Sequence, residues 1–357
     1  MEPYISFVTH SRNDHYTGVS AADNMNPSLN SLLYQVEKFK LPCEIIIVDW
    51  NYSESKPRLK DTLALPSTHP FATIKAIEVP AVHHQRFKNW KSKFVQSAAA
   101  GNVGIRRARG KFTVYRGNDV IYSNKLVEFL ATHEFELDKF YRCDRIDIDQ
   151  KVLQEDAIVT RNWHDVADLC SKYILRINDA LSCKAQEISK LPFLHTNACG
   201  DFTLTAQKNW ELIRGFMVGE HSYALYSDSS ALYALYGSGI KQEILKDDMV
   251  VYKPVHNAMT GALVVEQMPI GAEEMEGDIR SLKSEPKASD IIYALRTRKG
   301  YPYIIHKGKE ISIFPGNATY ERFWRWLANG KLPAQLNPRN WGLGDENLAT
   351  YTICNFD

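Results

Sequence analysis

The sequence lacks the features that mark membrane, secreted and nucleic-acid-binding proteins. It has no run of about 18 apolar residues, so we expect no membrane span. No basic stretch followed by an apolar one opens the chain, so no secretory signal is visible and we expect a cytoplasmic protein. The formal net charge of the 357 residues is +1, which leaves no electrostatic case for nucleic acid as the main partner.

Cysteine patterns that bind zinc or form a disulfide framework are also absent. The six cysteines show neither CxxC pairs nor zinc-type spacing, and several lie in apolar runs. We therefore expect reduced, buried thiols, as is usual in the cytosol. The six are Cys43, Cys143, Cys170, Cys183, Cys199 and Cys354.

No glycine-rich phosphate loop follows the first predicted strand. Neither GxGxxG nor GxxxxGK[ST] occurs there, so a standard NAD site and a P-loop kinase do not fit, and a methyltransferase is disfavoured. This absence favours a diphosphate bound through a metal ion over one held by backbone amides.

The first half of the chain alternates between apolar strands and helical segments. Helical connections of this length imply parallel strands joined by right-handed crossovers. The chain is long enough, at 44% hydrophobic residues, to bury the core of one large or two closely joined domains. We expect an α/β fold with a mixed, mostly parallel central sheet flanked by helices. The predicted strands are 4–9, 44–48, 73–79 and 111–115, and the predicted helices are 28–39 and 93–109.

Beyond residue 150 the regular alternation fades. Further helices are predicted at 165–174, at 207–213 and from Asp228 to Gly237, with a strand at 241–245. Aromatic residues within 319–330 recur at helical spacing.

An acid stands at the exit of the strand 111–115. Asp119 lies where doubly wound folds bind ligands, in the crevice at the carboxyl ends of the strands. This position suits a metal-bound diphosphate. An exposed turn aspartate is the alternative, because an Asn-Asp pair is common in turns.

Polar residues also follow the first two strands, whose carboxyl ends meet at one edge of the sheet. An acid after the second strand can accept hydrogen bonds from ribose hydroxyls or a base N–H. Taken together, these residues favour a nucleotide site, although each alone is an ordinary polar loop residue. They are Thr9, Ser11, Arg12 and Asp14 after the first strand and Asp49 and Asn51 after the second.

The segment 102–110, with the strand and acid that follow, resembles the GT-A glycosyltransferases, particularly the large inverting family that uses nucleotide-sugar donors. In that family the strand ends in Asp-x-Asp, which binds a divalent cation under the diphosphate. Here the three residues are Gly117, Asn118 and Asp119, so the first acid is missing. The resemblance implies Mn²⁺ or Mg²⁺ on Asp119, with Asn102 and Asn118 near the diphosphate or sugar. A hard cation can take its other ligands from phosphate and water.

The second half adds four residues to this resemblance. Gly200 and Asp201, in ACGDFTL, would lie on the acceptor side. Asp228 matches the general base of inverting members, although Ser227 replaces their preceding Glu, and an acid at a helix start also serves as a cap. His256, in YKPVH, would be the second metal ligand.

The order of six short elements is similar to that of a less characterised group of predicted glycosyltransferases. The resemblance implies a GT-A-like catalytic domain over 1–260, with a nucleotide-binding half (1–125) and an acceptor half (190–260), and a C-terminal extension over 261–357 packed on it. The elements are RND, WN, NVGIRRARG, ACGDFTL, Asp-Ser at a helix start and WGLG, at Arg12, Trp50, Asn102, Ala198, Asp228 and Trp341.

The expected protein is a metal-assisted, inverting hexosyl- or pentosyltransferase of glycan biosynthesis. It would move a sugar from a nucleotide-diphosphate sugar to a hydroxyl of a glycan or another acceptor. A sugar-phosphate nucleotidyltransferase shares a related sheet, but it normally has a glycine-rich basic loop after the first strand. A catalytically inactive carbohydrate-binding or scaffold protein would explain the acids missing at Gly117 and Ser227.

Overall fold

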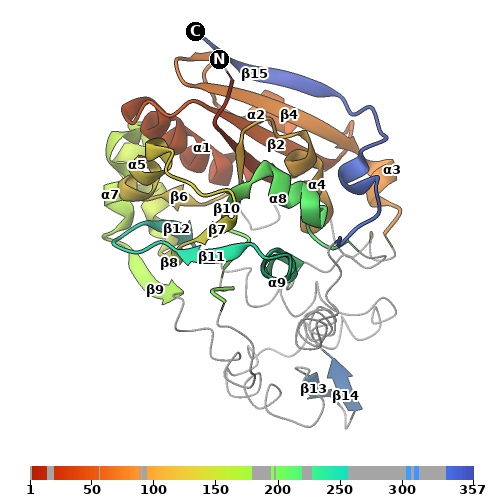
Figure 1. The fold of residues 1–357 in the computed structure, drawn as a ribbon. Helices are drawn as coiled ribbons and strands as arrows, with labels where there is room; N and C mark the ends of the chain where they lie inside the picture. The colour runs from red at the N-terminus through yellow and green to blue at the C-terminus, as the bar shows by residue number, and fades with distance from the viewer. Residues whose placement is uncertain are drawn as a thin grey trace.

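The computed structural model describes residues 2–13, 20–55, 57–87, 90, 95–178, 194–196, 198–218, 227–255, 303–306, 309–312 and 335–357. Within them the fold is α/β, built on a nine-stranded sheet of order β11-β7-β10-β5-β1-β2-β4-β15-β3 (Figure 1). The central strands β5, β1, β2 and β4 are parallel, and β10 and β15 flank them in antiparallel pairings. The predicted mixed, mostly parallel sheet flanked by helices is therefore confirmed.

The strands of the central sheet lie close to their predicted positions where a prediction was made. The observed strands are β1 Ile5–Ser11, β2 Cys43–Tyr52, β3 Thr68–His69, β4 Ala72–Pro80, β5 Phe112–Arg116, β7 Lys139–Arg142, β10 Phe202–Ala206, β11 Lys241–Ile244 and β15 Thr350–Phe356. Strand β2 is longer than predicted, so Asp49 lies inside it and not after it.

Two helical layers cover the two faces of this sheet. Helices α1 (Ala21–Lys38) and α5 (Asn124–Thr132) pack on the face that carries Phe7 and Ile45. Helices α4 (Ser97–Arg107), α8 (Gln207–Ile213) and α9 (Ser227–Gly237) pack on the opposite face. Because successive strand residues point to opposite faces, apolar runs such as Ile45–Val48 supply both cores. Two predicted helices differ at their ends, since α1 begins earlier and α4 is shorter than predicted.

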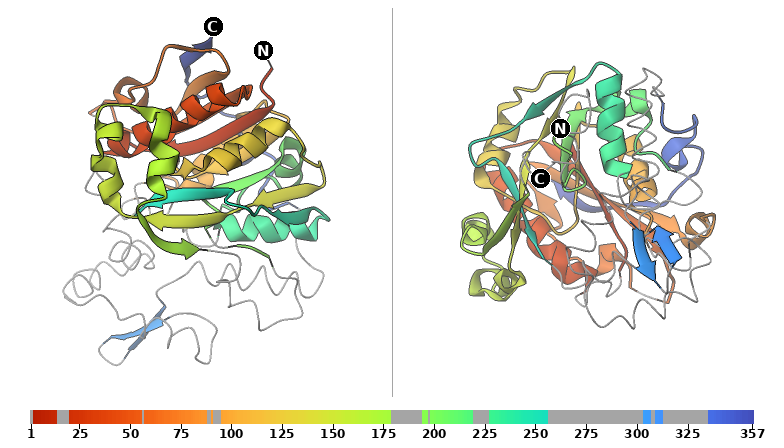
Figure 2. Two further views of the ribbon diagram at one scale, coloured as in Figure 1. Left: turned by 90° about the vertical axis from the view of Figure 1, so that its left-hand side faces the viewer. Right: turned by 90° about the horizontal axis from the view of Figure 1, so that it is seen from below.

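A second sheet of order β6-β12-β8-β9 lies beside the first. Its strands are β6 Ile121–Tyr122, β8 Asp144–Ile148, β9 Ile174–Asn178 and β12 Val250–Pro254. The segments that follow β8 are η1 (Gln150–Gln154), α6 (Asp156–Val159), η2 (Trp163–Asp165) and α7 (Val166–Cys170). These segments are drawn yellow-green in Figure 2, and of them η2 packs against α1.

The helix predicted over 165–174 is wrong in its second half. Helix α7 ends at Cys170, and Ile174 begins strand β9. Residues 174–178 alternate Ile-Leu-Arg-Ile-Asn and pair antiparallel with β8, so tertiary pairing decides a segment whose apolar residues fit either period.

Residues near the C-terminus join the central sheet. Strand β15 pairs with β4, and the turn η5 (Trp341–Leu343) packs on α4. Arg106 and Arg107 of the NVGIRRARG element donate hydrogen bonds to carbonyls of this turn, including Trp341 O at 2.7 Å and Gly342 O at 2.7 Å. The NVGIRRARG and WGLG elements therefore form one structural contact. The predicted domain limits stay a prediction, and the predicted helix 319–330 lies outside the described residues.

The remaining described elements are short. They are α2 (Leu59–Thr62), α3 (Ala81–His84) and the hairpin β13 (Tyr303–His306) and β14 (Lys309–Ser312). Five cysteines are buried free thiols, as predicted, and Cys183 lies outside the described residues. In the part of the chain that the structure describes, no helix has the length and apolar character needed to cross a bilayer.

Candidate functional site

Three of the predicted site residues meet at the carboxyl edge of the central strands. Ser11, the last residue of β1, lies opposite Asp49 in the parallel register of β1 and β2. Asn118, in the loop after β5, donates from Nδ2 to Ser11 Oγ at 3.1 Å. The loop after β5 is thus tied to the ends of β1 and β2, as parallel topology requires.

Asp49 is buried, with 1% of its surface exposed, and only part of its carboxylate is satisfied. The Leu59 N–H donates to Oδ2 at 3.0 Å, whereas Oδ1 has no hydrogen-bond partner among the described residues. Burial raises the Asp49 pKa to about 6, and the nearby Arg58 and Arg12 oppose this shift. Thr9 Oγ1 on β1 is likewise buried and unpaired in the described structure. Two buried acceptors at this edge suit the N–H and O–H donors of a nucleoside.

The neighbouring strand extends this polar edge. Glu78 on β4 lies opposite Asp49 in the β2–β4 register and forms an ion pair with Arg58 at 2.5 Å. Burial raises the Glu78 pKa against the pull of Arg58. Asn51 lies where the register of β2 shifts and has a positive φ of 58°, a conformation that Asn tolerates better than most residues.

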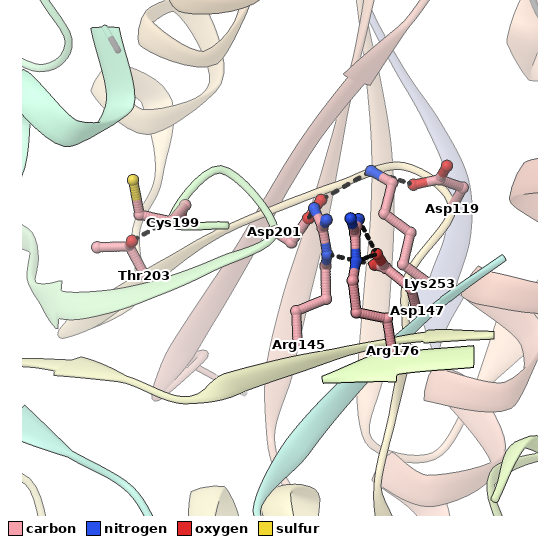
Figure 3. Close-up of polar contacts among 8 residues, drawn as sticks. All are labelled: Asp119, Arg145, Asp147, Arg176, Cys199, Asp201, Thr203 and Lys253. Carbon is pink, nitrogen blue, oxygen red and sulfur yellow. Dashed lines mark hydrogen bonds and ion pairs between the residues drawn. The ribbon is translucent and has the colours of Figure 1, made fainter. Parts of the chain in front are cut away.

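The centre of the site is a lysine between two aspartates (Figure 3). Lys253 Nζ on β12 lies 3.2 Å from Asp119 Oδ1 and 2.9 Å from Asp201 Oδ1. All three residues have little exposure, with 17% of the lysine side chain and 8% of each aspartate side chain accessible. Burial alone would lower the Lys253 pKa, but the two carboxylates raise it above its ordinary value, so the amine is an ammonium ion.

Asp201 fills the space left by the missing first acid of the Asp-x-Asp pattern. A Cβ built on Gly117 would lie 2.5 Å from Asp201 Oδ1. Strand β10 runs antiparallel to β5, with Phe202 opposite Arg116, so Asp201 arrives beside the end of β5. The resemblance placed Asp201 on the acceptor side. In the structure its carboxylate contacts Lys253, which also contacts Asp119.

One face of the second sheet supplies the remaining charges. Arg145 and Asp147 alternate with Ile146 along β8, so both point to the face that carries Lys253. Arg145 donates to Asp201 Oδ2 at 2.7 Å and lies 2.8 Å from Asp147 Oδ1. Burial would raise the Asp201 pKa, but Lys253 and Arg145 hold it below its ordinary value. Asp201 is therefore a carboxylate.

Asp147 is the acid on this face that balances Arg145. Its Oδ2 also accepts from Arg176 Nε, on strand β9, at 3.0 Å. Figure 3 shows Arg145 and Arg176 side by side, both reaching toward the Asp119, Asp201 and Lys253 group. The paired carboxylates and cations leave this face close to neutral.

Asp228 lies in the first turn of α9, facing the loop before β10. A Cβ on Gly200 would lie 2.9 Å from Asp228 Oδ2, so the glycine at this position makes room for the carboxylate. Asp228 Oδ1 accepts from the Ser229 N–H at 2.9 Å, and Asp201 contributes to its electrostatic environment. Burial raises the Asp228 pKa. The bond to Ser229 is compatible with a helix-start role, and the raised pKa is compatible with a base.

The side chain of Asn102 has a structural contact that the sequence did not reveal. Its Nδ2 donates to Phe216 O at 2.8 Å, and its Oδ1 accepts from Phe216 N at 2.7 Å. Because the buried carboxamide is used in this way, we do not assign it to the diphosphate or sugar. Asp14 and His256 lie outside the described residues, and Arg12 lies at the end of the described part of its loop.

Lys253, Arg145, Asp147 and Arg176 were not predicted. The signal was present in alternating charged and apolar residues, Asp-Arg-Ile-Asp-Ile over β8 and Tyr-Lys-Pro at the end of β12. Charged residues on one face of an otherwise apolar strand are unusual in a core. Lys253 and Arg145, however, pair with Asp119 and Asp201, which lie beside strands of the central sheet, and the sequence alone does not reveal this meeting of the two sheets.

A cavity of about 780 Å³ was also missed. It opens between the start of α1 and the segments that follow β8 and β12, and its lining includes Asp23, Asn26, Asp149, Lys151 and Val255. None of its described lining residues was predicted as a site residue. Because Asp149 and Val255 each lie close beyond Asp147 and Lys253 in the chain, the cavity borders the same end of the second sheet.

The described residues do not fit a metal ion on Asp119. Among them, no three His, Cys, Asp or Glu side chains are grouped closely enough to hold one. The two nearest acids, Asp119 and Asp201, already bind the Lys253 ammonium. The predicted Mn²⁺ or Mg²⁺ site also relied on His256, so its metal content stays a prediction.

No family model and no curated protein matches this chain. It is similar to the solved structure of residues 1–349 of S. aureus TarS in complex with UDP, with 11% identity and a TM-score of 0.43 over 83% of this chain and 75% of that one. It is also similar to the catalytic domain of Drosophila β1,4-galactosyltransferase 7 in complex with xylobiose, with 10% identity and a TM-score of 0.34 over 71% of each chain. Similarity at this level decides nothing about function, for which the residues of the site are the evidence.

Proposed function

We propose that this protein is a GT-A-like glycosyltransferase that uses a nucleotide-diphosphate sugar. The proposal rests on two sets of buried polar side chains that lie at the same edge of the central sheet. Asp49 offers a buried carboxylate oxygen that has no hydrogen-bond partner among the described residues, and the Asp119 and Asp201 carboxylates enclose a cation beside the end of β5. The first group suits a nucleoside and the second suits a diphosphate.

The nucleoside half of the donor fits the ends of β1 and β2. Thr9 Oγ1 and Asp49 Oδ1 are acceptors without partners in the described structure, and a ribose hydroxyl or a base N–H would satisfy them. A buried acceptor left unpaired costs about 1–3 kcal/mol, so a nucleoside that pairs it recovers that energy. Ser11 and Asn118, joined at 3.1 Å, would border the phosphates.

The transfer step follows from Asp228. In the proposed reaction an acceptor hydroxyl oxygen attacks the anomeric carbon while the bond from that carbon to the diphosphate oxygen breaks. The nucleoside diphosphate leaves with the bonding electrons, and Asp228 takes the hydroxyl proton. A single displacement of this kind inverts the anomeric configuration. The raised pKa of Asp228 supports the role, because a base is most effective when its pKa is near the working pH.

Binding and hydrolysis of nucleotide sugars test this function. The intact protein is screened by thermal shift with UDP-, GDP-, ADP- and CDP-linked sugars, where a ligand at about 100 times its dissociation constant adds about 2.7 kcal/mol of stability. An active transferase also releases free sugar and nucleoside diphosphate slowly without an acceptor. Binding without release would indicate the inactive carbohydrate-binding alternative, and no binding to any donor would refute the proposal.

A further inference from the structure

Lys253 occupies the position between the two acids of the site. Its Nζ lies 3.2 Å from Asp119 Oδ1 and 2.9 Å from Asp201 Oδ1. The side chain comes from β12 of the second sheet and reaches across to the loop after β5 (Figure 3). A lysine ammonium has three N–H donors. One N–H donates to Asp201 Oδ1, and the ammonium forms an ion pair with Asp119 Oδ1, so an N–H is left for an incoming oxygen.

We propose, on the basis of the function proposed above, that the Lys253 ammonium is the resident cation of the diphosphate site. It would donate to a phosphate oxygen of the donor and offset the negative charge that develops on the departing nucleoside diphosphate. In this reading Asp119 and Asp201 hold the ammonium in place, so the site needs no divalent ion between them.

Geometry makes the lysine and a divalent ion alternatives at this position. Mg²⁺ takes oxygen ligands at about 2.0–2.1 Å in near-octahedral geometry. A cation at that distance from Asp119 Oδ1 and Asp201 Oδ1 would have to displace the ammonium that lies about 3 Å from both. Arg145 also donates to the other oxygen of Asp201 at 2.7 Å. Moving Lys253 away would leave a buried ammonium without its partners, which is costly.

The charges around the site agree with a resident cation. Asp201 is shared between Lys253 and Arg145, and Asp147 between Arg145 and Arg176. Three carboxylates and three cations are therefore paired. Each carboxylate of this group already has a cationic partner, so a divalent ion would have to displace one of these side chains.

Lys253 also joins the two sheets, so a purely structural role must be distinguished from a phosphate-binding one. The chain offers a matched control. Lys139, at the start of β7, also bridges two carboxylates, with Nζ 2.7 Å from Glu136 and 3.1 Å from Glu243. Because Thr205, its neighbour on β10, lies opposite Thr113 near the start of β5, Lys139 is at the opposite edge of the sheet from the site.

The test is titration calorimetry of the intact protein with inorganic pyrophosphate, in EDTA and in MnCl₂. We expect the unchanged protein to bind in EDTA, with less than about twofold tighter binding in Mn²⁺. Lys253→Ala should bind about 10- to 100-fold more weakly in EDTA, the size expected for a lost charge-assisted hydrogen bond. Mn²⁺ should restore binding to this variant, because Asp119 Oδ1 and Asp201 Oδ1 then no longer contact an ammonium ion. Lys253→Arg should keep most of the affinity, and Lys139→Ala should keep all of it.

The results distinguish a phosphate-binding Lys253 from a metal-dependent diphosphate site and from a purely structural ion pair. Pyrophosphate binding by the unchanged protein only in Mn²⁺ would overturn the inference and leave the proposed transferase standing. A folded Lys253→Ala protein with unchanged affinity in EDTA would reduce Lys253 to a structural ion pair. If Lys253→Ala does not fold, Lys253→Arg and the unchanged protein still decide by their dependence on Mn²⁺. Failure to bind pyrophosphate and every nucleotide sugar in both conditions would refute the function and the inference together.

Discussion

Replacing Asp49 by asparagine should stabilise the ligand-free protein at neutral pH while weakening nucleotide binding. Burial raises the Asp49 pKa from its ordinary 3.8 to about 6. The folded protein therefore holds this proton more tightly than the unfolded chain does, and stability falls as pH rises from about 4 through about 6. Above that window the charged carboxylate costs about 3 kcal/mol of unfolding free energy, at about 1.4 kcal/mol for each pKa unit.

An asparagine carboxamide at this position would avoid the cost of the buried charge, but it would introduce a buried N–H donor without a partner. Its oxygen can still accept from the Leu59 N–H, as Asp49 Oδ2 does at 3.0 Å. Its NH₂ group would replace the unpaired Oδ1, and an unsatisfied buried donor costs about 1–3 kcal/mol. The net expectation is a gain of about 1 kcal/mol in the free energy of unfolding at pH 7. Because the wild-type penalty roughly halves by about pH 5, the gain should disappear or reverse there.

Urea unfolding of both proteins at pH 7 and pH 5, without ligand, measures this difference. Comparing the variant with the unchanged protein at each pH cancels most contributions from other titrating groups. Nucleotide binding at pH 7 should weaken by about 1–3 kcal/mol, because the donor groups of the nucleoside lose a charged acceptor. The reasoning is refuted if Asp49→Asn is less stable at pH 7 than at pH 5 relative to the unchanged protein. Unchanged nucleotide affinity would instead make Asp49 a structural acid.

Three further substitutions test neighbouring parts of the site. Asp228→Asn should reduce sugar transfer by about 10²- to 10⁴-fold with donor affinity unchanged; transfer at the wild-type rate, or a product with retained configuration by NMR, would contradict its role as base. Asn102→Ala should lower the free energy of unfolding by about 1–3 kcal/mol, because the buried Phe216 N–H loses its acceptor, while Phe216 C=O keeps Asn337 Nδ2 as a donor; a selective loss of donor affinity would instead place Asn102 in the donor site. Gly117→Ala should weaken pyrophosphate binding and lower the melting temperature, because its Cβ would lie 2.5 Å from Asp201 Oδ1; unchanged values of both would show that Asp201 is free to move.

Local patterns were sufficient for the central sheet and for part of the site. The apolar strands and the polar residues at their carboxyl ends predicted the meeting of Ser11 and Asp49, because parallel strands bring those ends to one edge. Asn118, which donates to Ser11, was expected there from the resemblance. The helix predicted over 165–174 extends too far, since α7 ends at Cys170 and Ile174 begins a strand; an apolar run fits a helix or a strand until its partner is known. The pairing with β8, which lies well before this segment in the chain, decided it.

The part of the site that could not be predicted depends on contacts between elements far apart in the sequence. Asn102 stands in a motif that resembles a donor-binding element, yet its carboxamide binds the main chain of Phe216. Lys253 stands in the segment that was noted for His256, and its significance comes from Asp119 and Asp201, which belong to other elements. The residue types of Asn102 and Lys253 were visible in the sequence, but their roles depend on partners that only the fold brings near.

The glycine in place of the first acid of the Asp-x-Asp pattern and the position of Asp201 explain one another. Glycine at position 117 leaves the space into which Asp201 projects, since any Cβ there would collide with its carboxylate. Asp201 in turn shares the Lys253 ammonium with Asp119. A chain that had simply lost an acid would leave a carboxylate-free gap at this point and a lysine with one partner. Here the second acid comes from the start of β10 and a cation is already paired with both, so the missing acid at Gly117 is no reason to regard the protein as inactive.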